Sequence, residues 1–131
     1  MCMKSIVWER ISKMLSAEGK EDLSRQMLDV LRVLVVYSGN SWKSELVQEL
    51  PLLRAFRGEP RVAGGRIEEA LGRLEKEGLV RVERRVRADM GASGGVEDEL
   101  ITLLDLSATR SAMAKDRVLS SYMSEQVTLS R

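Results

Sequence analysis

The sequence predicts a mainly α-helical fold with a small antiparallel β-hairpin, an α+β protein with extra helices at both ends. Three observations predict it. Apolar residues recur at helical spacing in several segments. One such segment runs through a single glycine directly into a segment of alternating valines, which is the spacing of a strand. A further apolar segment follows a glycine-rich stretch at residues 90–95, as the second strand of a hairpin would.

The first helix is predicted at residues 5–17, where an apolar face alternates with charged residues. Ser5 is its expected N-cap, and Gly19 is the expected stop. A longer helix is predicted at residues 21–38. Apolar residues cover more than one face of this second helix, so we expect it to lie at the centre of the fold.

A third helix is predicted at residues 43–50, with Ser41 as its cap. Pro51 either stops this helix or opens another turn, because proline fits the first turn of a helix but not its interior. The connection that follows is irregular and contains Gly64 and Gly65. These glycines suit either a flexible entry loop or a close approach to a phosphate at the next helix N-terminus.

The stretch from Arg66 to Glu83 joins a helix to a strand without a loop. Gly78 stands at the C′ position, where the left-handed conformation of a helix end favours glycine. The end of the helix is therefore expected to be fixed to the start of the strand. The apolar stripe of the helix consists of Ile67, Ala70, Leu71 and Leu74, and the alternating strand residues are Val80, Val82 and Val86.

The hairpin is predicted to pair a strand at residues 80–87 with a strand at 98–106, across a loop at 90–95. Ser107 is then the expected N-cap of a final helix at residues 108–127. The predicted units are an N-terminal helix (1–20), a central domain (21–106) and a C-terminal helix that is a candidate dimerisation element (107–131).

The composition limits the classes of function. The chain has 131 residues, of which 44% are hydrophobic and 31% charged, as in ordinary globular proteins. It contains no histidine and a single cysteine, so the commonest general base and an intrachain disulfide are both missing. We therefore expect no enzyme, no metal site and no cofactor. No apolar run spans a bilayer and no signal-peptide pattern is present, so we expect a cytoplasmic protein without a membrane partner.

The residues from Ala70 to Val82, Ala-Leu-Gly-Arg-Leu-Glu-Lys-Glu-Gly-Leu-Val-Arg-Val, resemble the winged helix-turn-helix superfamily. Dimeric bacterial and archaeal repressors of the PadR and MarR kinds are the nearest comparison, and the resemblance covers Leu23 to Leu106. It implies a recognition helix in the major groove and a wing on the DNA backbone or minor groove. In that comparison the first helix of the motif is 43–50, the recognition helix is 66–77, and the wing is 80–87 with 98–106.

The charges of the chain are compatible with a DNA-binding surface. Residues 54–87 contain ten basic and six acidic residues, whereas residues 88–106 contain five acids and no base. Arg66 and Arg73 are candidates for base edges or phosphates, and Lys76 for a phosphate. The full set of candidate DNA-binding residues is Arg61, Arg66, Arg73, Lys76, Arg81, Arg85 and Arg87.

Each of these contacts has a plainer alternative. Glu69 and Arg73 are four residues apart and could simply pair on the helix surface. The arginines of the first strand could pair with the acidic second strand across the hairpin. In that case the outer face of the helix would only be solvated, and the hairpin would have no unpaired cations for DNA.

The function that we expect is therefore binding of double-stranded DNA by a homodimeric transcription regulator. The alternative is a winged-helix module that binds protein in a larger assembly. Terminal helices form the dimer in comparable repressors, although here they could instead pack on their own domain. The candidate dimerisation residues are Ile11, Met14, Leu119, Tyr122 and Met123.

Overall fold

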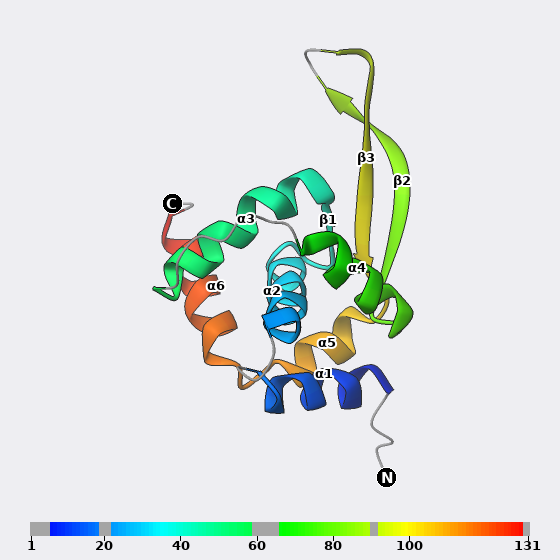
Figure 1. The fold of residues 1–131 in the computed structure, drawn as a ribbon. Coiled ribbons are helices and arrows are strands. Elements are labelled where there is room, and N and C mark those ends of the chain that lie inside the picture. The colour runs from blue at the N-terminus through cyan, green and yellow to red at the C-terminus, as the bar shows by residue number, and fades with distance from the viewer. Residues whose placement is uncertain (1–5, 19–21, 59–65, 90–91, 130–131) are drawn as a thin grey trace.

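The computed structural model describes residues 6–18, 22–58, 66–89 and 92–129 (Figure 1). Six helices and one three-stranded antiparallel sheet are present in these residues, which confirms the predicted α+β class. Ser5, Gly19, Arg61, Gly64 and Gly65 lie outside the described residues. The elements are α1 (Ile6–Ser16), α2 (Asp22–Val36), β1 (Asn40–Trp42), α3 (Lys43–Phe56), α4 (Ile67–Lys76), β2 (Val80–Asp89), β3 (Ala92–Leu103), α5 (Leu106–Ala112) and α6 (Arg117–Leu129).

Helix α2 lies at the centre of the molecule and the other helices surround it (Figure 1). Every side chain from Gln26 to Val35 is buried, so α2 is covered on all sides rather than along one stripe. The predicted central position is thus confirmed. The core residues that α4, the junction after it and the sheet contribute are Ile67, Ala70, Leu71, Leu74, Leu79, Val80, Ile101 and Leu103.

The junction between α4 and β2 is as short as the sequence predicts. Gly78 has a φ of +75°, in the left-handed region that glycine adopts without a steric cost. The N–H of Leu79 donates to the carbonyl of Leu74 over 2.9 Å, which closes the end of the helix. Leu79 is fully buried, and the strand begins at the next residue. The helix end therefore fixes where the hairpin starts.

The sheet has the strand order β1-β3-β2, with every neighbouring pair antiparallel. Strands β2 and β3 continue well beyond β1 and project from the helical body as a long hairpin (Figure 1). Near the outer end, a Cβ at Gly95 would lie 2.6 Å from Cγ1 of Val86 and 2.7 Å from the carbonyl oxygen of Arg87. Only glycine fits the hairpin at this position.

The structure corrects the prediction for residues 41–56. Ser41 lies in β1, where it pairs with Ile101, and the N-cap of α3 is Trp42, which makes no side-chain capping bond. Pairing with β3 holds this segment in an extended conformation up to the first residue of the helix. Helix α3 also continues through Pro51 to Phe56, because Leu50 and Leu53 on either side of the proline are both buried in the core. Pro51 has no backbone N–H and so cannot donate the helical hydrogen bond at its position, and this core packing offsets the loss.

The structure also corrects the predictions for the hairpin and the C-terminal helix. Strand β3 begins at Ala92 rather than 98 and ends at Leu103, so the loop is shorter than predicted. The helix predicted at 108–127 is two helices, separated at residues 113–116. Asp105, rather than Ser107, caps α5, since its carboxylate accepts from the N–H of Ala108 over 2.9 Å. A carboxylate at this position also interacts favourably with the helix dipole.

A buried ion cluster joins α2 to three other parts of the chain. The guanidinium of Arg32 is fully buried, and its N–H groups donate to Glu18 over 2.8 and 2.9 Å, to Asp29 over 2.9 Å and to Asp116 over 2.7 and 3.2 Å. Arg57 adds two bonds to Asp29, of 2.6 and 2.8 Å. Burial opposes the charge on Arg32, but the hydrogen bonds and charges of Glu18 and Asp116 outweigh it and raise the pKa.

We predict that Arg32→Gln lowers the free energy of unfolding by about 3–5 kcal/mol, because it leaves buried carboxylates without their counterion. Urea-induced unfolding followed by circular dichroism measures this loss. The matched control is Arg10→Gln, which breaks the exposed Arg10–Glu77 ion pair and should cost less than about 1 kcal/mol. Equal costs for the two variants would contradict a structural role for the cluster.

Candidate nucleic-acid interface

The outer face of α4 is open and carries both signs of charge. Glu69, Gly72 and Lys76 lie opposite the buried stripe, and all three are exposed. Arg73, beside them, is exposed as well. Within the part of the chain that the structure describes, neither Arg73 nor Lys76 forms an ion pair. Two cations of the predicted recognition helix are therefore available for a partner.

Arg66 is the third cation predicted for this face, and it has partners within the chain. Its Nε lies 3.3 Å from Oε2 of Glu69, and its Nη1 lies 3.9 Å from Oδ2 of Asp22. Glu69 thus pairs with Arg66 and leaves Arg73 without the partner that their spacing allowed. These groups are all about half exposed, so the pairs are weak and a stronger anion can replace them.

The acidic flank of α4 is used to hold the helix against the rest of the fold. Glu68 forms an ion pair with Lys43 at the start of α3, and Lys43 also lies 3.3 Å from Glu99 of β3. On the neighbouring turn, the carboxylate of Glu75 accepts from the backbone N–H of Val82 over 3.2 Å. These carboxylates join α4 to α3 and to both long strands.

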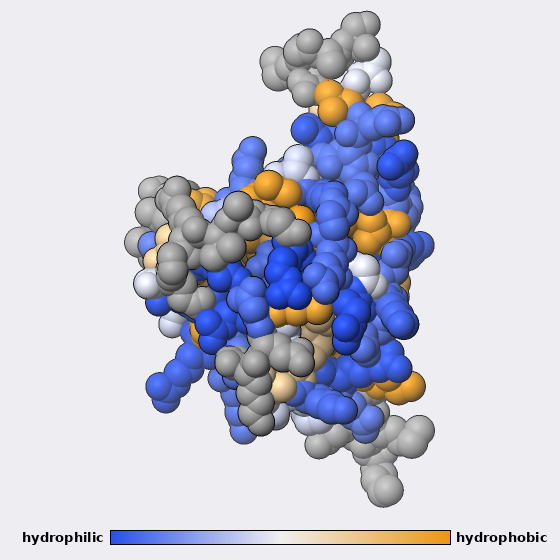
Figure 2. Space-filling model, viewed as in Figure 1, coloured by the Kyte–Doolittle hydropathy of each residue, from blue (hydrophilic) through white to orange (hydrophobic). Residues whose placement is uncertain are grey.

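The arginines of β2 lie on a hairpin surface that is largely hydrophilic (Figure 2). Arg81 and Arg85 share one carboxylate, Glu83, at 3.5 and 2.7 Å. The hydrogen bond from Arg85 lowers the pKa of Glu83, so this carboxylate stays charged at neutral pH. Arg87 pairs across the hairpin with Asp98 at 2.9 Å. Of these three arginines, only Arg87 makes the pair across the hairpin that the sequence raised as an alternative, whereas Arg81 and Arg85 pair within β2.

Arg84 lies on the opposite face of β2 and was not among the candidate residues. The strand register places it directly across from Glu99. Its side chain is exposed at the edge of a cleft of about 270 Å³ between the N-terminal end of α3 and the hairpin. Arg84 forms no ion pair in the described part of the chain. It adds a free cation to the hairpin.

Asp98 fixes the position of the hairpin relative to α3. Its carboxylate accepts from the hydroxyl of Ser44 over 2.5 Å, from the N–H of Glu99 over 2.8 Å and from Nε of Arg87 over 2.9 Å. Partial burial opposes the charged form of Asp98, but these hydrogen bonds outweigh it and lower the pKa below its ordinary value. Sequence reasoning missed Ser44 and Asp98 as partners, because they are 54 residues apart.

The five candidate dimerisation residues do not form one exposed surface. Ile11, Leu119 and Tyr122 are buried in the core of their own chain, so they are not open to a second copy in this arrangement. Met14 is partly buried, and only Met123 is well exposed, at 40%. Three of the five candidate residues thus pack on their own domain, which is the alternative to a dimer contact.

Comparisons of the chain with family models, curated proteins and solved structures found no match. Among the described residues, no group of three or more cysteine, histidine or acidic side chains is placed to hold a metal ion. In the same residues, no helix is both long enough and apolar enough to cross a membrane.

We predict that Asp98→Asn destabilises the protein at neutral pH and that this difference shrinks in acid. A carboxylate with a lowered pKa stabilises the fold above the ordinary aspartate value of about 4, and this contribution is lost as the pH falls through the lower folded value. Urea unfolding of both proteins over a series of pH values measures the difference. Glu97→Gln, an exposed change on the same strand, is the control. A pH-independent difference for Asp98→Asn would refute the assignment.

Proposed function

We propose that the protein binds double-stranded DNA through a winged-helix unit that comprises α2, β1, α3, α4, β2 and β3, and that it acts as a homodimeric transcription regulator. One observation carries the proposal: α4 and the projecting hairpin are adjacent (Figure 1), and both carry exposed cationic side chains. The sheet order β1-β3-β2 joins the helical body to both strands of the hairpin. In this unit α4 is the recognition helix, and the hairpin is the wing.

Helix α4 is suited to the major groove by its shape and by its outer side chains. It is a short helix with a glycine, Gly72, in the middle of its exposed face, and a Cβ added there would meet no other atom of the protein. The backbone of α4 can therefore approach a partner closely. Arg73 and Lys76 supply contacts to phosphates or guanine, and Glu69 is of the type that accepts a hydrogen bond from cytosine.

The hairpin supplies contacts to the DNA backbone. Arg81, Arg84 and Arg85 are all exposed on it, and the pairs of Arg81 and Arg85 with Glu83 are solvent-accessible. Exposed pairs of this kind contribute little to stability, so phosphate oxygens can take the place of the carboxylate. Each phosphate contact also releases condensed counterions, which makes the affinity fall with salt concentration.

The homodimeric part of the proposal is supported by a different observation. Leu52 and Phe56 lie one turn apart on α3 and are 47% and 38% exposed. Phe56 also packs edge-on against Tyr122 of α6, with ring centroids 5.7 Å apart. An apolar pair beside a terminal helix is a suitable contact for a second copy of the chain in the proposed homodimer. Analytical ultracentrifugation of Phe56→Ser against the native chain tests this part of the proposal.

We predict that Arg73→Gln and Lys76→Gln each weaken DNA binding and lower the slope of log affinity against log salt by about 1, since each removes one phosphate contact. Fluorescence anisotropy with a labelled duplex pool of random sequence, titrated at several salt concentrations, measures both quantities. Arg117→Gln on α6 removes an exposed arginine away from α4 and the hairpin, and should leave the slope unchanged. No binding of the native protein to duplex at low salt would refute the proposed function.

Removal of a carboxylate from the hairpin is expected to strengthen DNA binding. Glu83→Gln frees Arg81 and Arg85 and removes a carboxylate that repels phosphate. We therefore predict tighter binding in the same anisotropy assay and a steeper dependence on salt. Glu125→Gln on α6 makes the same charge change on an exposed residue outside the proposed interface. An equal gain in both variants would mean that only net charge matters and that the hairpin makes no contact.

A further inference from the structure

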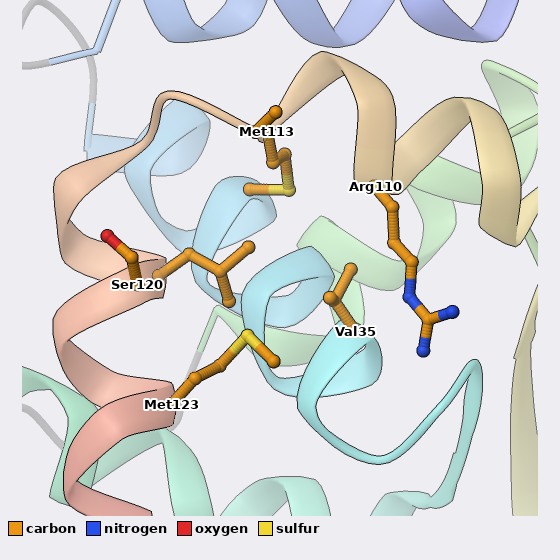
Figure 3. A pocket seen from close by; sticks show the side chains of 7 residues that line it. Val35, Arg110, Met113, Ser120 and Met123 are labelled. Atoms are coloured by element: carbon orange, nitrogen blue, oxygen red, sulfur yellow. The ribbon is translucent and has the colours of Figure 1, made fainter.

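A cavity of about 230 Å³ lies between α2, α5 and α6 (Figure 3), and none of its described lining residues belongs to α4 or to the hairpin. Its walls are mainly apolar. Val35 of α2 and Met113 at the end of α5 point into it, and Met123 of α6 closes one side (Figure 3). Leu119, Ala114, Ser120 and Arg110 complete the lining. The cavity is partly open to solvent at the exposed residues of this set.

The break between α5 and α6 creates this space. A single straight helix would carry its apolar side chains along one line, but the turn at residues 113–116 directs α6 away from α5. Asp116 fixes the turn, because its carboxylate accepts from the N–H of Leu119 over 3.2 Å and also binds the buried Arg32. The cavity is therefore bounded by a rigid turn rather than by a loose chain end.

The charge at the cavity has one sign. Figure 3 shows the side chain of Arg110 reaching past Val35, on the side opposite Ser120. Arg110 is exposed and forms no ion pair in the described residues, and none of the described residues that line the cavity is acidic. The Ser120 hydroxyl lies within hydrogen-bond distance of the carbonyls of Asp116 and Arg117 and is thereby occupied. The guanidinium is the only charged group in the described lining.

We propose that this cavity binds a small amphipathic carboxylate, with the apolar chain against Val35, Met113 and Met123 and the carboxylate on Arg110. The volume is below the range of about 300–1,000 Å³ that holds drug-sized ligands, which favours a short aliphatic acid. Methionine side chains adapt to flexible alkyl chains. Arginine binds a carboxylate through two parallel hydrogen bonds. The site is independent of the proposed DNA-binding function.

The test is isothermal titration of the full chain with octanoate, below its micelle concentration. Octan-1-ol and octylammonium are the matched probes, because they keep the alkyl chain but carry no charge or the opposite charge. The expected result is one octanoate per chain, with binding that is about tenfold weaker for octan-1-ol and weaker still for octylammonium, as for loss of one charge-assisted hydrogen bond. Equal binding of all three probes would overturn the proposal, since the guanidinium would then have no role.

Two variants locate the site. Arg110→Gln should weaken octanoate binding about tenfold without changing the binding of octan-1-ol. Arg110→Lys should retain part of the preference for octanoate over octan-1-ol. Ser120→Phe places a large ring at the exposed rim of the cavity and should abolish binding of both probes. Circular dichroism verifies that each variant is folded. Undiminished octanoate binding by folded Ser120→Phe would overturn the proposal. The proposal would also be overturned if the native protein were a dimer that does not bind octanoate and that Ser120→Phe dissociates, because the cavity would then be an interface between copies.

Discussion

The buried guanidinium of Arg32 is the constraint on which the rest of the structure depends. An arginine in the core of a small protein is tolerated only when its donors are matched by acceptors and its charge is balanced. Here the acceptors come from the chain after α1, from α2 itself and from the turn before α6. These separate segments must therefore be in place together. This requirement holds the segment just after α1, and the turn that separates α5 from α6, against α2.

The elements with a periodic signal could be predicted from the sequence, and the others could not. Helix α4 and strand β2 follow from spacing alone, and Gly78 marks the residue between them. Strand β1 has only three residues, too few for a period, and it exists because β3 lies beside it. The continuation of α3 through Pro51 likewise depends on core contacts made by Leu50 and Leu53. Local preference was overruled in both cases by packing between distant segments.

The candidate site was predictable in its composition but not in its pairing. The sequence identifies which arginines lie on α4 and the hairpin, but it does not tell which carboxylate each one meets. Glu83 takes two arginines, and Glu69 takes Arg66 rather than Arg73. The sequence does contain one signal of buried pairing: Gln26, Asp29 and Arg32 recur every three residues in the otherwise apolar segment 26–35 of α2. Polar side chains in such a row, in a helical segment whose remaining residues are all apolar, indicate a buried network.

The tethering of α4 has a consequence for how any partner would be met. Glu68 and Glu75 attach α4 to α3, through Lys43, and to the backbone of β2, while Asp98 attaches the hairpin to Ser44. Helix and hairpin are thus preorganised, with their relative angle set before encounter. A complex formed by such a surface loses little conformational entropy, since few torsions remain to be ordered. The same rigidity restricts the range of shapes that the surface can accept, so selectivity here rests on geometric fit as well as on charge.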